Sequence, residues 1–256
     1  MSKKTSRSSS VDRALTLLDC FTEKNFYLSL NEITQKSGIP RSTVFRMLTS
    51  LETFGYIKNV KVSGKTLYSL GHAFLEKGML VHRHIDIREY ARDYLIELRN
   101  ELNLTVQLAI RDGLDALYIE QIPSFRSIQL YPAIGRKAPL YSAACPRVLL
   151  AFTKDKEREY LLNQYNFRSF TPNTPVELAD ITKRLKCIRK EKYSISKGEL
   201  FEGTIAIAVP IFCPHTNEVL AALSVIGLER DFENVIDSYI SILQRTAFNI
   251  SKEMER

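Results

Sequence analysis

Apolar residues recur at helical spacing in short segments near the start of the chain. The first segment predicts an amphipathic helix over residues 11–22, with an apolar stripe formed by Val11, Ala14, Leu15, Leu18 and Phe21. Ser29 and Glu32 have the spacing of a capping box and predict the start of a second helix over residues 30–37.

A tight turn and a third helix follow. Gly38 tolerates a positive φ and predicts the end of the second helix, and Ile39 is expected to be buried in the turn. Pro40 is expected at the first position of a helix over residues 40–54, where its missing N–H would have no partner in any case. This succession predicts a helix-turn-helix.

The third helix carries the groups expected to contact DNA. Its apolar face, Val44, Leu48 and Leu51, is expected to pack against the first two helices. In a helix-turn-helix the second helix of the pair enters the major groove, where Arg contacts guanine and Ser or Thr contacts bases or phosphates. Such groups lie on the opposite face and at the N-terminal end: Arg41, Ser42, Thr43, Arg46, Thr49 and Ser50. The alternative interpretation is an ordinary solvated helix face.

Two strand patterns come next. Residues 56–60 and 66–70 predict a hairpin, joined by a glycine-containing loop over residues 61–65. Lysines along this wing are expected to meet phosphates, or alternatively to protect an exposed strand edge: Lys58, Lys61 and Lys65. Helices and hairpin together predict a winged helix-turn-helix domain over residues 1–71.

The rest of the chain mixes helical and strand patterns. Residues 72–85 predict a helical linker, and its apolar stripe of Phe74, Leu75, Met79 and Leu80 is suited to pairing with a second copy of the chain. Further helices are predicted at 86–102, 146–152, 155–165, 177–191 and 232–253, and strands at 106–110, 116–121, 127–131, 204–212 and 219–227. This mixture predicts an α+β fold, with an effector domain over residues 86–256 built on an antiparallel sheet.

The excess positive charge lies in the first third of the chain. The 256 residues carry a formal net charge of +7. Residues 1–85 hold 13 Lys and Arg against 6 Asp and Glu, whereas the remainder holds 23 of each kind. This asymmetry indicates a polyanionic partner, and nucleic acid is favoured because no basic amphipathic helix suited to a membrane surface is present. A merely basic surface is the alternative.

Location and cofactors follow from what the sequence lacks. The longest uncharged stretch, residues 203–217, is shorter than the roughly 18 apolar residues of a membrane span, and the N-terminus has no apolar segment behind its charges. His82 and His84 fall on different faces of a helix, so no metal site is predicted, and no cofactor is implied. Cysteines without metal-ligand spacing indicate reduced thiols in the cytoplasm: Cys20, Cys145, Cys187 and Cys213.

The segments in this order resemble the IclR family of bacterial transcriptional regulators. In the first third the resemblance runs through residues 11–15, 30–33, 38–44 and 51–56, and in the remainder through residues 135–144, 193–194, 198–199, 203, 206–208 and 210. It covers nearly the whole chain after the first ten residues. It implies a repressor or activator, a homodimer or a dimer of dimers, with a GAF-like effector domain.

Two sets of site residues follow. The DNA-binding set that we predict adds one residue of the first helix to those of the third helix and the wing: Arg13, Arg41, Ser42, Thr43, Arg46, Lys58, Lys61 and Lys65. The resemblance implies an effector pocket lined by Leu130, Ala138, Ala144, Cys145, Ser196, Ala206, Ser224 and Ile226. This mostly apolar set with hydroxyl and thiol groups suits a small organic molecule.

The pocket region departs from the family pattern. The usual Gly-Lys after the small residue near Ala144 is replaced by Cys145, Pro146 and Arg147, and the acidic pair often found near Ser196 is missing. A helix that starts at Pro146 leaves backbone N–H groups free for an anion, and Arg147 adds positive charge. We therefore hypothesise a small organic acid, such as an aromatic acid or a sugar acid, with its carboxylate at this helix start. An ordinary cap facing water is the alternative.

An enzyme is the rival class. Cys145 at a helix N-terminus would have a lowered pKa, but a nucleophile also needs a base, and no pattern places a histidine beside it. The sequence therefore predicts a non-enzymatic transcriptional regulator that binds an operator in double-stranded DNA under the control of a small-molecule effector. The remaining alternative is a metabolite-binding or structural oligomeric module without sequence-specific DNA binding.

Overall fold

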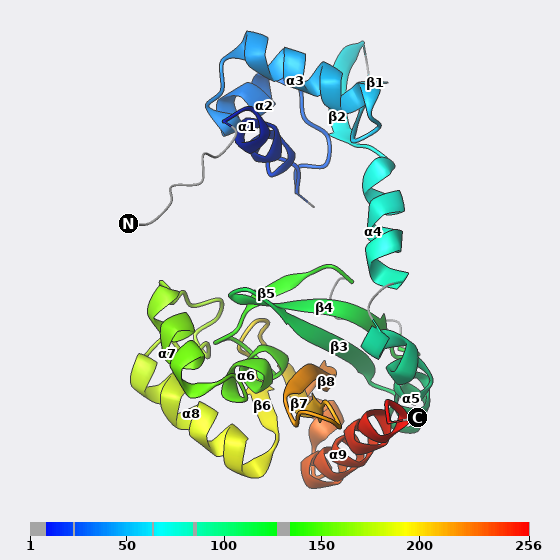
Figure 1. Ribbon diagram of the computed structural model, residues 1–256, viewed down its shortest axis with the longest axis vertical. Helices are drawn as coiled ribbons and strands as arrows, with labels where there is room; N and C mark the ends of the chain where they lie inside the picture. The colour runs from blue at the N-terminus through cyan, green and yellow to red at the C-terminus, as the bar shows by residue number, and fades with distance from the viewer. Residues whose placement is uncertain (1–8, 23, 63, 84–85, 127–133, 256) are drawn as a thin grey trace. The chain divides into compact units, whose positions relative to one another are not determined.

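The computed structural model describes residues 9–22, 24–62, 64–83, 86–126 and 134–255, and it divides into two compact units, Met1–His84 and Ile85–Arg256 (Figure 1). Each unit has its own apolar core. Among the described residues, no helix combines the length and the apolar character that crossing a bilayer requires. The predicted α+β fold is confirmed.

The first unit is a winged helix-turn-helix followed by one further helix. Its elements are α1 (Ser9–Leu18), α2 (Leu30–Ser37), α3 (Arg41–Thr53), β1 (Ile57–Val62), β2 (Lys65–Leu70) and α4 (Ala73–Arg83). The predicted capping box is present, because the Ser29 N–H donates to Glu32 Oε2 at 2.7 Å and the Glu32 N–H donates to Ser29 Oγ at 3.3 Å. The Ser29 hydroxyl also donates to Glu32 Oε2 at 2.7 Å, and this bond, together with the one from the Ser29 N–H, lowers the pKa of the Glu32 carboxyl. Gly38 ends α2 with a φ of 66°, as predicted.

Helix α1 differs from its prediction in length and in the face that it buries. It ends at Leu18, whereas the sequence pattern suggested a helix as far as residue 22. Leu17 is fully buried, but Val11 and Leu15 are 56% and 54% exposed. Val11 and Leu15 of the predicted stripe therefore lie on the surface of this unit, whereas Phe21 belongs to its core and Leu18 packs against that core.

Helix α3 begins one residue later than predicted. Pro40 is the N-cap, with an extended ψ of 137°, and Arg41 is the first helical residue. The Pro40 carbonyl accepts the Val44 N–H at 3.0 Å. Val44 and Leu48 are fully buried and Ile39 is nearly so, which confirms the predicted apolar face and turn.

The wing is tighter than predicted. The two strands pair from Ile57 with Leu70 to Val62 with Lys65, so the paired strands extend into the segment that the sequence predicted as a five-residue loop. Gly64 adopts a φ of 78°, a backbone conformation that favours glycine.

Gly55 and Gly71 bring the end of α3 and the start of α4 into close backbone contact. The Gly71 N–H donates to the Tyr56 carbonyl at 2.8 Å, and the Ala73 N–H donates to the Gly55 carbonyl at 3.2 Å. A Cβ at Gly71 would lie 2.0 Å from the Gly55 oxygen. Only glycine therefore fits at residue 71 without moving backbone.

The second unit is a sheet with helices on both faces. Its elements are α5 (Asp86–Leu102), β3 (Thr105–Asp112), β4 (Asp115–Ile122), β5 (Lys137–Pro139), α6 (Ala144–Ala151), α7 (Asp155–Gln164), α8 (Leu178–Glu191), β6 (Ser194–Lys197), β7 (Thr204–Phe212), β8 (Val219–Leu228), the 3-10 turn η1 (Glu229–Phe232) and α9 (Ile236–Glu253). The strands are antiparallel in the order β5-β4-β3-β8-β7-β6. The short strands β5 and β6 were not predicted, and the strand predicted at 127–131 lies outside the described residues.

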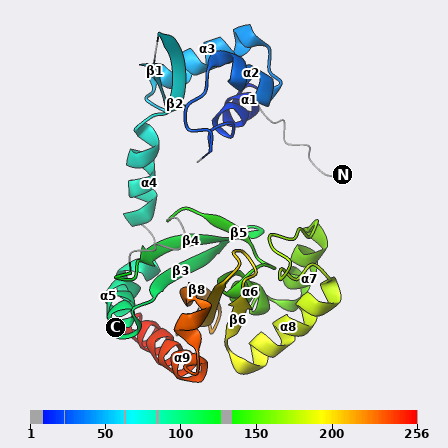
Figure 2. The ribbon, with the colours of Figure 1, turned by 180° about the vertical axis from the view of Figure 1, so that it is seen from behind.

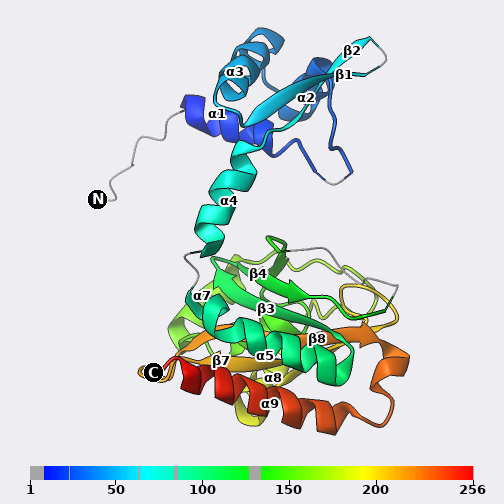
Figure 3. The same ribbon diagram turned by 90° about the vertical axis from the view of Figure 1, so that its right-hand side faces the viewer.

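The two faces of the sheet have separate cores. Helices α5 and α9 lie side by side on one face (Figure 3) and pack on Val106, Leu108, Ile207 and Leu223. Helix α6 packs on the other face, where Ala109, Ala208 and Ala222 leave room for it, and α8 lies beside α6 (Figures 1 and 2). The small residues on this face thus allow a helix to approach the sheet closely.

A β-bulge in β4 changes which way its residues face. Leu108 pairs with Glu120 and Ala109 pairs with Tyr118, so Ile119 is the extra residue. Tyr118 packs on the α6 side, whereas Ile119 belongs to the core on the α5 side. Glu120 faces α5 as well, where it is buried and accepts a hydrogen bond from Arg88 Nε at 2.7 Å. The bulge thus places a carboxylate beside an apolar core.

Gly71→Ala is expected to destabilise the first unit by about 1–3 kcal/mol, because its Cβ would push against the Gly55 backbone. Gly78→Ala is the matched control. Nothing lies within 4 Å of a Cβ at this position in α4, and alanine favours a helix over glycine by roughly 0.5–1 kcal/mol. Urea unfolding followed by circular dichroism measures both. Equal stability of the two variants would contradict the backbone contact.

Candidate functional site

The polar face of α3 is open to solvent. Arg41, Ser42 and Arg46 are exposed, and Thr43 is half-buried at the start of the helix. No acidic residue lies in the first turn of α3. The predicted set of DNA-contacting groups thus forms one accessible surface.

Arg13 of α1 lies on the same surface groove as Arg46 of α3. The groove runs between these helices and encloses about 1030 Å³. Exposed apolar side chains also line it: Val11, Leu15, Phe45, Phe54 and Phe74. The groove therefore combines two cations with a large apolar surface.

The wing lysines divide between its two faces. Strand alternation and register place Lys58 and Lys65 on one face and Lys61 on the face that packs toward α3. Lys61 and Lys65 flank the turn and are exposed. Lys58 stands further back and lines a hollow that also contains Glu52 and Glu76. Lys61 and Lys65 thus lie near the tip on opposite faces of the hairpin, and Lys58 lies farther from the tip.

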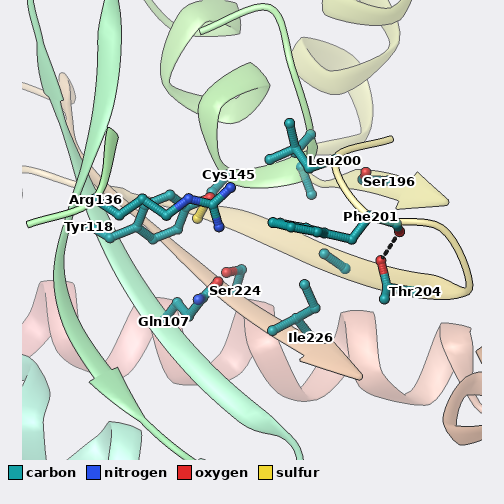
Figure 4. Close-up of a pocket in the computed structure, with 13 residues that line it drawn as sticks. Gln107, Tyr118, Arg136, Cys145, Ser196, Leu200, Phe201, Thr204, Ser224 and Ile226 are labelled. Carbon is teal, nitrogen blue, oxygen red and sulfur yellow. Dashed lines mark hydrogen bonds between the residues drawn. The ribbon is translucent and has the colours of Figure 1, made fainter. Parts of the chain in front are cut away.

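A small cavity in the second unit lies between the sheet and the start of α6 (Figure 4). It is lined by residues of β3, β4, β6, β7 and β8, by the residue before β5, by the start of α6 and by the loop that follows β6: Gln107, Tyr118, Arg136, Ala143, Ala144, Cys145, Ser196, Leu200, Phe201, Thr204, Ala206, Ser224 and Ile226. The space that the centre of a water molecule can reach inside it is about 30 Å³. This is room for about one or two waters.

The cavity gathers most of the predicted effector-binding residues. Six line it: Ala144, Cys145, Ser196, Ala206, Ser224 and Ile226. Ala138 does not, because it is buried in the adjacent core beside Ala116 on β4. Leu130 lies outside the described residues.

Sequence reasoning missed the other lining residues. Strand alternation could have found Thr204, which is two residues from Ala206 on the same face of β7. Arg136 lies in the segment that carries the family resemblance, two residues before Ala138. Leu200 and Phe201 lie in a loop, where no periodic pattern indicates which side chains point inward.

Helix α6 starts earlier than predicted, and its start is strained. Its first residue is Ala144 and not Pro146. The N-cap, Ala143, has φ 54° and ψ −177°, a conformation that is almost confined to glycine. Such a conformation costs of order 1–3 kcal/mol, so the surrounding contacts must hold it in place.

Glu199 provides those contacts. Its carboxylate accepts the Ala143 N–H at 3.2 Å and forms a two-pronged ion pair with Arg147, in which Arg147 Nη2 lies 2.9 Å from Glu199 Oε1. Arg147 and Glu199 are 1% and 3% exposed. The expectation that Arg147 offers its charge to a ligand is therefore wrong, since the guanidinium is buried against Glu199 and the Ile195 carbonyl.

Arg136 and Phe201 fill much of the cavity mouth. The guanidinium carbon of Arg136 lies 4.9 Å from the centre of the Phe201 ring, as expected for a cation–π contact. Figure 4 shows the Arg136 side chain directed toward Phe201 and lying beside Tyr118.

Cys145 is not suited to act as a nucleophile. Burial raises the pKa of its thiol to about 12, and its Sγ lies 3.5 Å from the Ala222 carbonyl oxygen. The pKa of this thiol thus moves in the direction opposite to that of an activated cysteine. Within the described residues, no group of three or more His, Cys, Asp or Glu side chains is arranged to hold a metal ion.

Comparison with known proteins decides the family. Residues 10–61 match the IclR helix-turn-helix domain, and residues 79–252 match the C-terminal domain of the bacterial transcriptional regulator IclR. The chain belongs to the IclR family. This membership confirms the predicted class, a DNA-binding transcriptional regulator with an effector domain and not an enzyme.

Known relatives align with nearly the full length of this chain. The chain is 34% identical over 249 residues to the HTH-type transcriptional regulator KipR of Bacillus subtilis, which covers 97% of this chain and 98% of KipR. The crystal structure of the Thermotoga maritima IclR has a TM-score of 0.75 and 29% identity, and it covers 96% of this chain and 99% of its own. An IclR homologue from Microbacterium hydrocarbonoxydans, complexed with 4-hydroxybenzoate, shares the fold with a TM-score of 0.81 at 19% identity, covering 96% of this chain and 99% of its own.

Glu199→Ala in this IclR protein is expected to cost about 3–5 kcal/mol, because it leaves the Arg147 guanidinium buried without its carboxylate. Arg184→Ala is the control, since Arg184 lies 3.5 Å from the same carboxylate but is 42% exposed. It is expected to cost less than about 1 kcal/mol. Urea unfolding of the full chain measures both, and similar losses for the two variants would show that the buried pair does not organise the cavity.

Cys145 is expected to resist iodoacetamide at pH 7, because its buried thiol stays protonated. Hydrogen bonds from Thr216 lower the pKa of the partly exposed Cys213, which is expected to react first. Mass spectrometry of the alkylated peptides follows both residues, and denaturant should abolish the difference. Equal labelling of the two cysteines in the folded chain would contradict the burial of Cys145.

Proposed function

We propose that this regulator binds a roughly palindromic operator as a homo-oligomer, and that a small carboxylic acid in the cavity beside α6 modulates the binding. One observation supports the proposed effector site. Residues that the family resemblance implied, drawn from widely separated segments and including Cys145, Ser196 and Ser224, converge on one cavity. A cytoplasmic location follows from the DNA partner.

The DNA half rests on the exposed cations of the first unit. Arg46 lies on the open face of α3, where a guanidinium reaches the base edges of the major groove. Lys61 and Lys65 flank the tip of the wing, where an ammonium group meets phosphates without reading sequence. Arg13, Arg41, Ser42, Thr43 and Lys58 complete the proposed DNA-binding set.

The oligomer is supported by apolar surface that a single chain leaves open. Val11 and Leu15 on α1 and Leu75 and Leu80 on α4 are each more than half exposed. Large exposed apolar patches mark interaction sites, and such stripes on helices suit pairing with a second copy. A two-fold dimer would then present two α3 helices to two half-sites. A dimer of dimers would form from two such pairs.

The effector is proposed from the chemistry of the cavity. Its lining is mostly apolar with hydroxyl, amide and thiol groups, which suits a small organic molecule. The homologue complexed with 4-hydroxybenzoate supports a carboxylate. Regulation requires that the acid bind the DNA-competent and DNA-incompetent states with different affinity. In contrast to the sequence-based hypothesis, the N–H of Ala143 at the start of α6 already bonds Glu199.

Arg46→Ala is expected to lower the discrimination between operator and random DNA by about 1–3 kcal/mol, because it removes a base contact. Lys65→Ala is expected to weaken both DNAs about equally, because it removes a phosphate contact. Fluorescence anisotropy over a range of salt concentrations measures both, and wild-type affinity is expected to fall steeply with salt. If the two variants behave alike, the proposed roles are wrong. If the full chain binds no promoter DNA, the alternative function is favoured, which is a metabolite-binding or structural oligomeric module without sequence-specific DNA binding.

A further inference from the structure

The cavity beside α6 has one charged side chain in its lining. Of the thirteen lining residues that the structure describes, only Arg136 carries a full charge at neutral pH. The others are apolar or are neutral polar groups such as Gln107 and Ser224. A charged ligand bound in the cavity would therefore interact with the Arg136 guanidinium before any other charged lining group.

Two other positive groups near the cavity already have partners. The Ala143 N–H at the start of α6 donates to Glu199 at 3.2 Å. The Arg147 guanidinium is 1% exposed, pairs with the same carboxylate, and donates to the Ile195 carbonyl at 3.0 Å. Glu199 thus stands where an anionic ligand of a helix N-terminus would otherwise bind. The charged side chain that lines the cavity itself is that of Arg136.

Arg136 is held in position to meet a ligand. Its carbonyl accepts the Tyr118 N–H at 3.0 Å, and the Gly135 N–H donates to the Tyr118 carbonyl at 2.8 Å, so its backbone is fixed to β4. Its side chain extends over the cavity toward Phe201 (Figure 4). A guanidinium binds a carboxylate with two parallel hydrogen bonds, which favours acids over neutral analogues of the same shape.

The Phe201 ring fills space that a ligand needs. The cavity has about 30 Å³ open to the centre of a water molecule, which is too little for an organic acid. Phe201 is 40% exposed, so its ring can leave toward solvent without crossing the core. Once the ring has moved, an acid would meet the guanidinium with which Phe201 now makes contact.

We propose that Arg136 selects effectors that carry a carboxylate, and that the body of the effector takes the space that the Phe201 ring fills here. This inference rests on the proposed effector function of the same cavity. It assigns the two parts of recognition to two side chains. Arg136 determines the class of ligand, and Phe201 sets the cost of opening the cavity for any ligand.

The test is a set of acids and their primary amides: benzoate, 4-hydroxybenzoate and pyruvate against benzamide, 4-hydroxybenzamide and pyruvamide. Isothermal titration of the full-length chain measures each Kd. The wild-type chain is expected to prefer at least one acid over its amide by about ten- to a hundredfold, the range of a charge-assisted hydrogen bond. Arg136→Gln is expected to abolish this preference while it leaves binding of the amide unchanged, and Arg136→Lys is expected to restore part of it.

Lys137→Gln is the matched control, because Lys137 has the same charge on the adjacent residue but pairs with Asp112, its Nζ 2.6 Å from Oδ2. It is expected to keep the wild-type preference. Phe201→Ala is expected to tighten acid and amide by similar factors, because no ring must leave the cavity.

Failures of the two proposals are distinguishable. If the wild-type chain binds no member of the set, the proposed acid effector falls and this inference falls with it. If the wild-type chain prefers the acid and Arg136→Gln keeps that preference, only the role of Arg136 is wrong. If Phe201→Ala weakens both ligands, the ring belongs to the binding surface, and its role as a filler of the empty cavity is overturned.

Discussion

The buried carboxylate of Glu199 holds together the segments that form the effector cavity. It binds the Arg147 guanidinium on α6 and the Ala143 N–H ahead of that helix, while the Glu199 carbonyl accepts the Thr174 hydroxyl. A charge buried this deeply is tolerated only when it has an oppositely charged partner. Because the pairing fixes Ala143 in a conformation that alanine avoids, the strained start of α6 depends on a residue in a distant loop. The shape of the cavity is a consequence of this one interaction.

The two units differ in net charge. Residues 1–85 carry the whole excess of positive charge, and the remainder holds equal numbers of acidic and basic residues. A neutral effector unit does not compete with the DNA-binding unit for phosphate. Within it, Glu199 compensates the charge of Arg147, and the recognition of a small anion is proposed for Arg136. In this account, long-range attraction to DNA and short-range selection of an acid are separate properties of separate surfaces.

Local signals were predictable from the sequence, and long-range pairing was not. The capping box of α2 and the apolar face of α3 depend on residues within a turn or two of each other, so periodicity and cap chemistry were sufficient to predict them.

Other features were not predictable from local patterns. Strands β5 and β6 have three and four residues, too few for an alternating pattern. The burial of Arg147 depends on a partner 52 residues away. Strict alternation from Tyr118 would place Glu120 on the α6 side of the sheet, but the bulge at Ile119 turns it toward α5. Six of the eight residues in the predicted effector set nevertheless line one cavity, because family resemblance carries long-range information.

The central claim is that occupancy of the cavity and binding of DNA are thermodynamically linked. The most direct measurement is a titration of the full-length chain with an acid that it binds, first without DNA and then with saturating promoter DNA, together with the reverse titration. Linkage requires that the acid change the Kd for DNA by the same factor as DNA changes the Kd for the acid, typically about 5- to 150-fold. A factor of one in both titrations, with both ligands bound, would contradict the account.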